Sequence, residues 1–333
     1  MDFQLRRQRK RKKKLIIILL FIFAGTICLY VVFNQFIKNE QSSSANRTND
    51  SVVIINPLSQ VSPTYTESNS LKEVVDNALE GTKGTYGIVI KNLKNGQSYY
   101  ANEHKVFEAG SLYKLWIMTT VYKQIQSGQL KEDQILSEDV AMLNQKFEID
   151  PDSAEETEGT VTFTVYDALY QMITISHNYA ALLLTEKVKL SSVATFLKEN
   201  GFTESRVGIN SDFPTATASD IALFYEKLYK QSLLFSSEKS KGELVNQQYT
   251  IEMIDLLKNQ QLNNGLPKYL PKDLSIAHKT GEIDFFKHDS GIVYTDFGDY
   301  IIVVMSESDS PLGAQERIAL VSKGAFDYFT SEQ

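Results

Sequence analysis

A serine and a lysine three residues apart, in the segment Ser111-Leu112-Tyr113-Lys114, are the residues of this chain best suited to covalent chemistry. The apolar pattern around them predicts a helix over 111–126, and positions i and i+3 of a helix lie on one face, one turn apart. An amine that close can remove the hydroxyl proton and leave a serine nucleophile. Ser-x-x-Lys is common on helices, so its weight depends on partner groups elsewhere in the chain.

Two further polar motifs lie where such partners are needed. A Ser-His-Asn tripeptide from Ser176 to Asn178 separates two predicted helices, and a Lys-Thr-Gly tripeptide from Lys279 to Gly281 lies on a predicted strand. The spacings are 65 residues from Ser111 to Ser176 and 103 from Ser176 to Lys279. Ser-x-x-Lys, Ser-x-Asn and Lys-Thr-Gly in this order form the signature of serine β-lactamases and penicillin-binding proteins. The chain therefore resembles this superfamily, specifically the branch around the class A β-lactamases.

The resemblance implies a proton relay around Ser111. Ser111 is expected to be the nucleophile, and Lys114 the base that accepts its proton. Because an ammonium cannot accept a proton, Lys114 must be neutral for part of the cycle, and the apolar neighbours, Trp116 among them, favour the neutral form. Ser176 is expected to pass a proton to the leaving group, with Lys279 polarising its hydroxyl.

The same resemblance implies the substrate contacts. Asn178 is expected to bind a substrate amide and to hold Lys114, while Lys279 and Thr280 are expected to bind a substrate carboxylate. Capping of a helix is the alternative role for Ser176 and Asn178.

Backbone groups complete the expected site. Gly281 would let substrate lie close to the strand, since a side chain there would intrude. The oxyanion hole would be formed by the backbone N–H groups of Ser111 and Glu282.

Two departures from the class A pattern stand out. His177 occupies a position where the family usually has Asp, and we interpret it as structural. The family also places a Glu-x-x-x-Asn segment, whose glutamate activates the deacylating water, before a Thr-rich stretch such as 215–218. Here Glu204 and Asn210 have the wrong spacing, and Asp212 is a conceivable substitute. Without that base, hydrolysis of a β-lactam adduct should be slow.

The elements that position these motifs follow from the periodicity. Two groups of strands are predicted: 85–93 and 97–102, joined by a Lys-Asn-Gly turn, then 274–280, 288–295 and 299–307. Helices are predicted over 71–80, 111–126, 164–174, 178–188, 191–199, 217–230, 250–259 and 312–329. The order predicts an α/β (α+β) fold with one antiparallel five-stranded sheet flanked by helices and an inserted all-helical lobe. The domain spans 70–331, and a cleft between the two lobes would hold the site.

The N-terminus predicts a membrane anchor. Residues 1–14 contain one acid, Asp2, and eight basic side chains: Arg6, Arg7, Arg9, Lys10, Arg11, Lys12, Lys13 and Lys14. The next 23 residues, 15–37, are uncharged and would span roughly 34 Å as a helix. The basic flank should remain cytoplasmic, which places the C-terminal bulk outside the cell as a single-pass protein.

A polar segment, 38–69, follows the anchor and is expected to be an extracellular tether. Cys28, the single cysteine, lies within the apolar span, so no disulfide is expected in the exported part. With 42% hydrophobic residues, the remainder can form a sizeable core. The net charge of −7 and the position of the basic run beside the apolar run argue against a nucleic-acid partner.

No cofactor or metal is expected, because the histidines have no ligand spacing and no Gly-rich phosphate loop is present. The leading interpretation is a membrane-anchored extracellular serine acyl-enzyme hydrolase or transferase acting on D-alanyl peptides of peptidoglycan or D-alanyl esters of wall polymers. β-Lactams are possible covalent ligands. The alternatives are a β-lactamase and a non-catalytic wall-binding or β-lactam-sensing ectodomain.

Overall fold

The computed structural model describes residues 69–208, 213–234 and 243–331, which lie in the second of two units of the chain, Pro63–Gln333. The predicted segments 1–14 and 15–37 lie outside the described residues, and so do residues 38–68 of the predicted tether. Its last residue, Asn69, is the first residue of α2. Within the described part, no helix has the length and apolar character needed to cross a bilayer.

Five antiparallel strands form the main sheet in the order β2-β1-β9-β8-β7. The strands are β1 (Thr85–Asn92), β2 (Ser98–Ala101), β7 (Ile276–Ile283), β8 (Phe286–Val293) and β9 (Tyr300–Glu307). The five predicted strands and their single antiparallel sheet are confirmed. Because β7 is an edge strand, one of its edges has no neighbouring strand and can contact other elements, such as η1 (Gly110–Tyr113).

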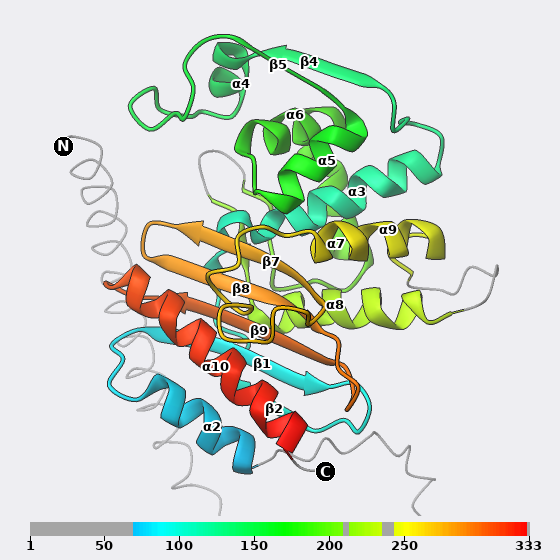
Figure 1. The fold of residues 1–333 in the computed structure, drawn as a ribbon. Coiled ribbons are helices and arrows are strands. Elements are labelled where there is room, and N and C mark those ends of the chain that lie inside the picture. Colours follow the sequence, from blue (N-terminus) through cyan, green and yellow to red (C-terminus); the bar gives the residue numbers. More distant parts are fainter. Residues whose placement is uncertain (1–68, 209–212, 235–242, 332–333) are drawn as a thin grey trace, which may run out of the picture. The chain divides into compact units, whose positions relative to one another are not determined.

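Two helices cover one face of this sheet. Figure 1 shows α2 (Asn69–Leu79) beside α10 (Pro311–Ser331), the long red helix. Their buried side chains pack with those of the sheet in one cluster, which includes Leu71, Val75, Ile318, Val321, Ile88, Ile90, Ile302 and Val304. The predicted flanking of the sheet by helices is confirmed, and the first and last described helices share one face.

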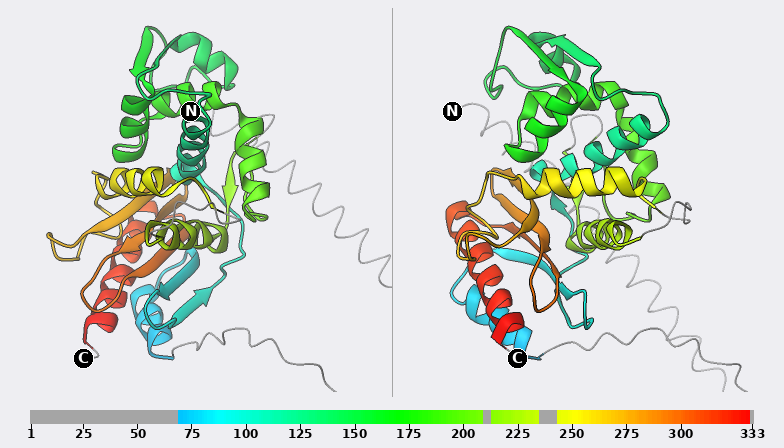
Figure 2. Two further views of the ribbon diagram at one scale, coloured as in Figure 1. Left: turned by 90° about the vertical axis from the view of Figure 1, so that its right-hand side faces the viewer. Right: turned by 45° about the vertical axis from the view of Figure 1, so that its right-hand side comes forward.

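The opposite face carries the remaining helices. These are α3 (Lys114–Gln126), α4 (Val140–Lys146), α5 (Val165–Thr174), α6 (Asn178–Val188), α7 (Leu190–Glu199), α8 (Ala218–Ser232) and α9 (Gln247–Lys258). Helix α8 packs on the sheet and α9 on β7, while α3 lies among α5, α6, α7 and α9 (Figure 2).

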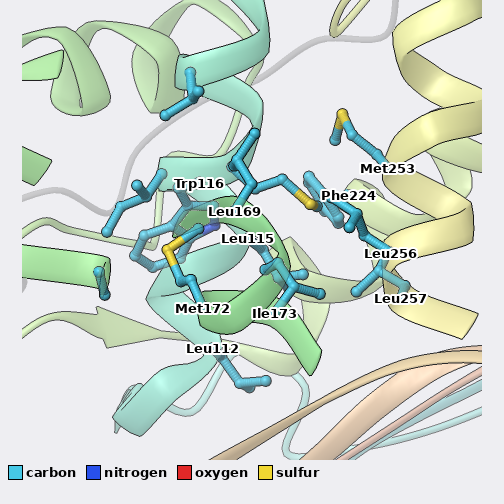
Figure 3. Packing of buried hydrophobic residues seen from close by; sticks show 14 of the residues in the cluster. Leu112, Leu115, Trp116, Leu169, Met172, Ile173, Phe224, Met253, Leu256 and Leu257 are labelled. Atoms are coloured by element: carbon cyan, nitrogen blue, oxygen red, sulfur yellow. The ribbon is translucent and has the colours of Figure 1, made fainter. Parts of the chain in front are cut away.

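The first nine residues of α3, from Lys114 to Tyr122, are all buried. Figure 3 shows Leu115 and Trp116 among side chains of three other helices: Leu169, Met172, Ile173, Phe224, Met253, Leu256 and Leu257. A helix that is apolar all round belongs in a core. The lysine at its start is therefore held on a rigid, dry support.

Two details correct the sequence expectation. The inserted lobe is not all-helical, because β4 (Ile135–Asp139) and β5 (Thr160–Thr164) form an antiparallel pair within it. Each strand has a single buried residue, too few for a period-two pattern to be recognised. A second short pair joins β3 (Phe107–Glu108) to β6 (Thr215–Ala216).

The predicted helix over 111–126 is also divided. Its first residues form a 3₁₀ turn, η1 (Gly110–Tyr113), and the α-helix begins at Lys114. In a 3₁₀ turn, side chains at i and i+3 eclipse each other, so Ser111 and Lys114 still point from the same side.

Candidate active site

The η1 turn is held against the sheet edge by two glycines. Gly110 has φ +50°, and a Cβ on it would lie 2.7 Å from the backbone N of Glu282. A Cβ on Gly281 would lie 2.8 Å from the carbonyl O of Ala109. Both distances are shorter than real Cβ contacts, so only glycine allows η1 to reach β7. The group that lies closest to Gly281 is therefore the backbone of Ala109, in the same chain. The close approach of a substrate to Gly281 stays a prediction.

Lys114 reaches from the start of α3 to the connection between α5 and α6. Its ammonium donates to Ser176 O at 2.5 Å, to Asn178 Oδ1 at 2.7 Å and to Ser176 Oγ at 3.1 Å. The side chain has no exposed surface. All three N–H bonds of the charged form thus have acceptors, and the Ser111 hydroxyl has no hydrogen-bond partner among the described residues.

Ser176 is the meeting point of the two lysines. Lys279, on β7, donates to the same Ser176 Oγ at 3.1 Å and to Thr280 O at 2.9 Å. Ser176 has φ +61°, a left-handed conformation uncommon for a non-glycine residue. Such strain persists where surrounding contacts over-determine it. Here the two ammonium groups fix both the serine carbonyl and its hydroxyl.

Burial decides the protonation of both lysines. It lowers the pKa of Lys114 well below the usual lysine range, and the positive charge of Lys279 lowers that pKa further, while Glu155 raises it. Burial likewise lowers the pKa of Lys279 to about 7, against Asp289 and Glu282, which raise it. A neutral Lys114 beside a charged Lys279 is therefore accessible near neutral pH.

Asn178 uses both ends of its amide. Its Oδ1 accepts from Lys114, and its Nδ2 donates to Glu155 Oε1 at 2.6 Å. The predicted hold on Lys114 is present in the structure, while binding of a substrate amide stays a prediction. Glu155 belongs to no sequence motif and lies in the exposed loop between α4 and β5.

His177 has a structural place. Its Nδ1 accepts from Ala180 N at 3.2 Å, which caps α6, and its ring packs edge-on against Phe163 with centroids 5.6 Å apart. His177 is thus the capping residue, and neither Ser176 nor Asn178 fills that alternative role.

The Lys-Thr-Gly strand presents little charge to solvent. Lys279 has no exposed surface and Thr280 is 4% exposed. The next residue, Glu282, pairs with Lys287, which lies directly opposite it on β8, and accepts from Gln315 Nε2 at 3.5 Å. Binding of a substrate carboxylate by Lys279 and Thr280 stays a prediction, and the ammonium already has two acceptors here.

Buried groups behind β7 support this strand. His288 Nδ1 accepts from Ser306 N at 3.0 Å, so its Nε2 carries the proton and donates to Glu108 O at 2.8 Å. Burial lowers the pKa of His288 to about 4, which keeps the ring neutral. This bond joins β8 to the residue before Ala109 and so helps to fix the η1 turn.

A second support involves Asp289, which is 1% exposed. His278 Nδ1 lies 2.9 Å from Asp289 Oδ1, and Leu266 N donates to Asp289 Oδ2 at 2.8 Å. The Asp289 carboxylate also raises the pKa of Lys279. Neither Asp289 nor His288 belongs to a recognisable motif, and only the strand register brings them to the site.

The candidates for a deacylating base are elsewhere or outside the described residues. The Glu204 carboxylate accepts from Thr217 Oγ1 at 2.9 Å and pairs with His104 Nδ1 at 3.0 Å. Asn210 and Asp212 lie outside the described residues. In the described ranges, no group of three or more His, Cys, Asp or Glu side chains could hold a metal ion.

The arrangement can support acyl transfer to Ser111. A neutral Lys114 can take the serine proton, and Ser176, accepting from Lys279, can donate its own proton to a leaving group. The Ser111 and Glu282 amides, brought together by the Gly110 contact, are the nearest candidates for holding an oxyanion.

Comparisons with known proteins identify the family and the fold. A family model described as "Beta-lactamase enzyme family" matches residues 69–329. A search of curated protein sequences finds no significant match.

Several solved structures share the fold. A β-lactamase from Sphaerobacter thermophilus DSM 20745 is 23% identical, with a TM-score of 0.66 over 79% of this chain and 98% of that one. PBP-A is 21% identical, with a TM-score of 0.68 over 81% and 99%. A class A β-lactamase representative from Bacteroides cellulosilyticus DSM 14838 is 20% identical, with a TM-score of 0.64 over 79% and 98%.

The glycine contact under Ser111 can be tested by Gly110→Ala. The added Cβ would push Glu282 N away, and we expect acylation of Ser111 by a thioester donor to slow by about 100-fold. Gly96→Ala is the matched control, because Gly96 has φ +77° but nothing within 4 Å of the added Cβ. Intact mass over time measures both rates. An unchanged rate in folded Gly110→Ala would show that this contact does not hold the site.

The shared serine predicts a bell-shaped pH profile for acylation. The rate should rise as Lys114 loses its proton, at a pH well below the usual lysine range, and fall above about pH 7 as Lys279 becomes neutral. Lys279→Arg keeps a permanent charge and should remove the falling limb. Single-turnover rates from pH 5 to 10 measure this, with thermal unfolding as the check on folding. A falling limb that persists in Lys279→Arg would assign it to another group.

Proposed function

Because the chain belongs to the β-lactamase enzyme family of serine hydrolases, we propose that it forms an acyl-enzyme at Ser111. Its proposed substrates are D-alanyl peptides of peptidoglycan or D-alanyl esters of wall polymers. The acyl group then passes to water or to another acceptor. β-Lactams, as cyclic amides, are proposed to acylate the same serine.

One observation carries this proposal: the Ser176 hydroxyl lies 3.1 Å from each of two buried lysine ammonium groups. A buried cation is costly, and two that share one acceptor are more so. A binding protein needs neither charge there. A serine hydrolase needs one lysine neutral as a base and the other charged beside the proton donor.

The chemistry balances with these groups alone. Ser111 Oγ attacks the acyl carbon while its proton moves to neutral Lys114, and the carbonyl electrons move onto the oxyanion. As the oxyanion collapses, the bond to the leaving group breaks and Ser176 supplies that group with a proton. Ser176 is reprotonated by Lys114, which returns to its neutral form.

A β-lactamase is the second candidate. It is favoured by the family match and by solved structures of similar fold that are named β-lactamases; a variant of PBP-A is recorded as an acyl-enzyme complex with penicillin G. Against rapid turnover stands the environment of Glu204, which is bound by His104 and Thr217.

A time course with penicillin G, nitrocefin and a D-alanyl thioester tests these candidates. We expect the mass of the 63–333 protein to increase by one acyl group, with slow loss from the β-lactam adducts and faster turnover of the D-alanyl donor. Rapid nitrocefin hydrolysis would favour the β-lactamase. Stoichiometric acylation without turnover would indicate a sensor, and no adduct on Ser111 relative to Ser111→Ala would refute the proposed function.

We also propose that residues 15–37 anchor the protein, with 1–14 cytoplasmic and the hydrolase domain outside the cell. The support is the uncharged 23-residue run behind eight basic side chains. Protease added to intact cells should remove the domain from the full chain. Protection from protease until lysis would contradict this orientation.

A further inference from the structure

One carboxylate, Glu155, lies at the rim of the site, where it contacts Asn178. It is exposed, whereas the two site lysines are buried. A substrate that approaches Ser111 therefore meets exposed negative charge before it meets buried positive charge.

Glu155 is a carboxylate that acts on Lys114 through its charge but forms no direct ion pair with a described residue. Its Oε1 accepts from Asn178 Nδ2 at 2.6 Å, which ties the exposed loop to the start of α6. Within the part of the chain that the structure describes, no Lys, Arg or His lies within ion-pair distance of it. The site therefore holds a fixed anionic group one hydrogen bond away from the Asn178 amide.

The cation on the β7 side of the site is closed to a substrate carboxylate. Lys279 is buried and donates to Ser176 and to Thr280 O. Lys287, the nearest cation along β8, pairs with Glu282, which also contacts Gln315 of α10. A substrate carboxylate would therefore have to approach an ammonium that has no exposed surface.

We propose that the site selects acyl donors that carry a free ammonium and no carboxylate, as an aminoacyl ester does, and that Glu155 binds the ammonium. The inference rests on the proposed function and chooses between its two substrate classes. A peptide that ends in D-alanine has a carboxylate and an acylated amine, so it has the opposite charge pattern. The ester reacts as above: the C–O bond breaks, Ser111 takes the acyl group, and the alcohol leaves with a proton.

Binding at Glu155 would also favour the base form of Lys114. The Glu155 charge raises the pKa of Lys114, so an ammonium that pairs with Glu155 weakens this effect. A cationic donor would therefore help to prepare the base that its own acylation needs, and an acetylated donor would not.

A pair of thioesters that differ only in the ammonium tests the inference: D-alanyl and N-acetyl-D-alanyl, with the same neutral thiol. We expect the wild-type kcat/KM for acylation to be about fivefold higher for the free amine, and the preference to fall in 1 M salt. Glu155→Gln should remove the preference, measured as the ratio of the two kcat/KM values, in which any effect of the lost charge on Lys114 cancels. Glu158→Gln, an exposed carboxylate of the same loop, is the matched control and should retain the preference.

A second comparison, of D-alanyl thioglycolate with its methyl ester, tests the exclusion of a carboxylate. The wild type should be acylated about fivefold faster by the methyl ester, because the Lys279 ammonium has no exposed surface with which to pair a carboxylate. Faster acylation by the thioglycolate would overturn this part of the inference. Faster acylation by N-acetyl-D-alanyl than by D-alanyl thioester in the wild type overturns the inference but leaves the proposed function standing. No adduct on Ser111 with any donor overturns both.

Discussion

The site depends on one shared acceptor, the Ser176 hydroxyl between the ammonium groups of Lys114 and Lys279. Two positive charges so close together in a buried place repel each other. The pair of lysines is therefore stable only if one of them is neutral for much of the time. Because one lysine must be neutral while the other is charged, the pair can pass protons through Ser176. The lysine with the more strongly lowered pKa becomes the base, and its partner keeps the charge that polarises the serine.

The packing of the fold holds Ser176, Lys114 and Lys279 together in spite of the repulsion between the two lysines. Lys114 starts a helix whose first nine residues are buried, so it cannot move outward to solvent. Lys279 lies on an edge strand whose register is fixed along eight residues of β8. Gly110 and Gly281 allow the turn that carries Ser111 to approach that edge. Each charged lysine would be more stable in water, but the packed helices and strands prevent its side chain from reaching solvent.

Much of this could be predicted from the sequence because it is local. The long sheet strands are short apolar runs buried on both faces, and the helices show apolar faces, so element order and sheet composition could be predicted. The three motifs were found because their members are adjacent in sequence. The β4–β5 pair was not found, since each strand has only one buried residue. Glu155 was not found either, because its meeting with Asn178 depends on how a 13-residue connection, 147–159, folds back.

The buried charges of the site have larger interaction energies than the exposed ones. The buried charges therefore control the reaction, and the exposed charges control the choice of substrate. Opposite charges 4 Å apart interact with about 1 kcal/mol in water and about 4 kcal/mol near a protein surface of effective dielectric constant 20. The rim carboxylate, Glu155, lies toward the first value, so it can bias selection only several-fold. The buried lysines lie toward the second, where the loss of one group changes the reaction by orders of magnitude. Selection among acyl donors should therefore be graded and sensitive to salt, whereas the capacity to acylate Ser111 should be nearly all-or-none.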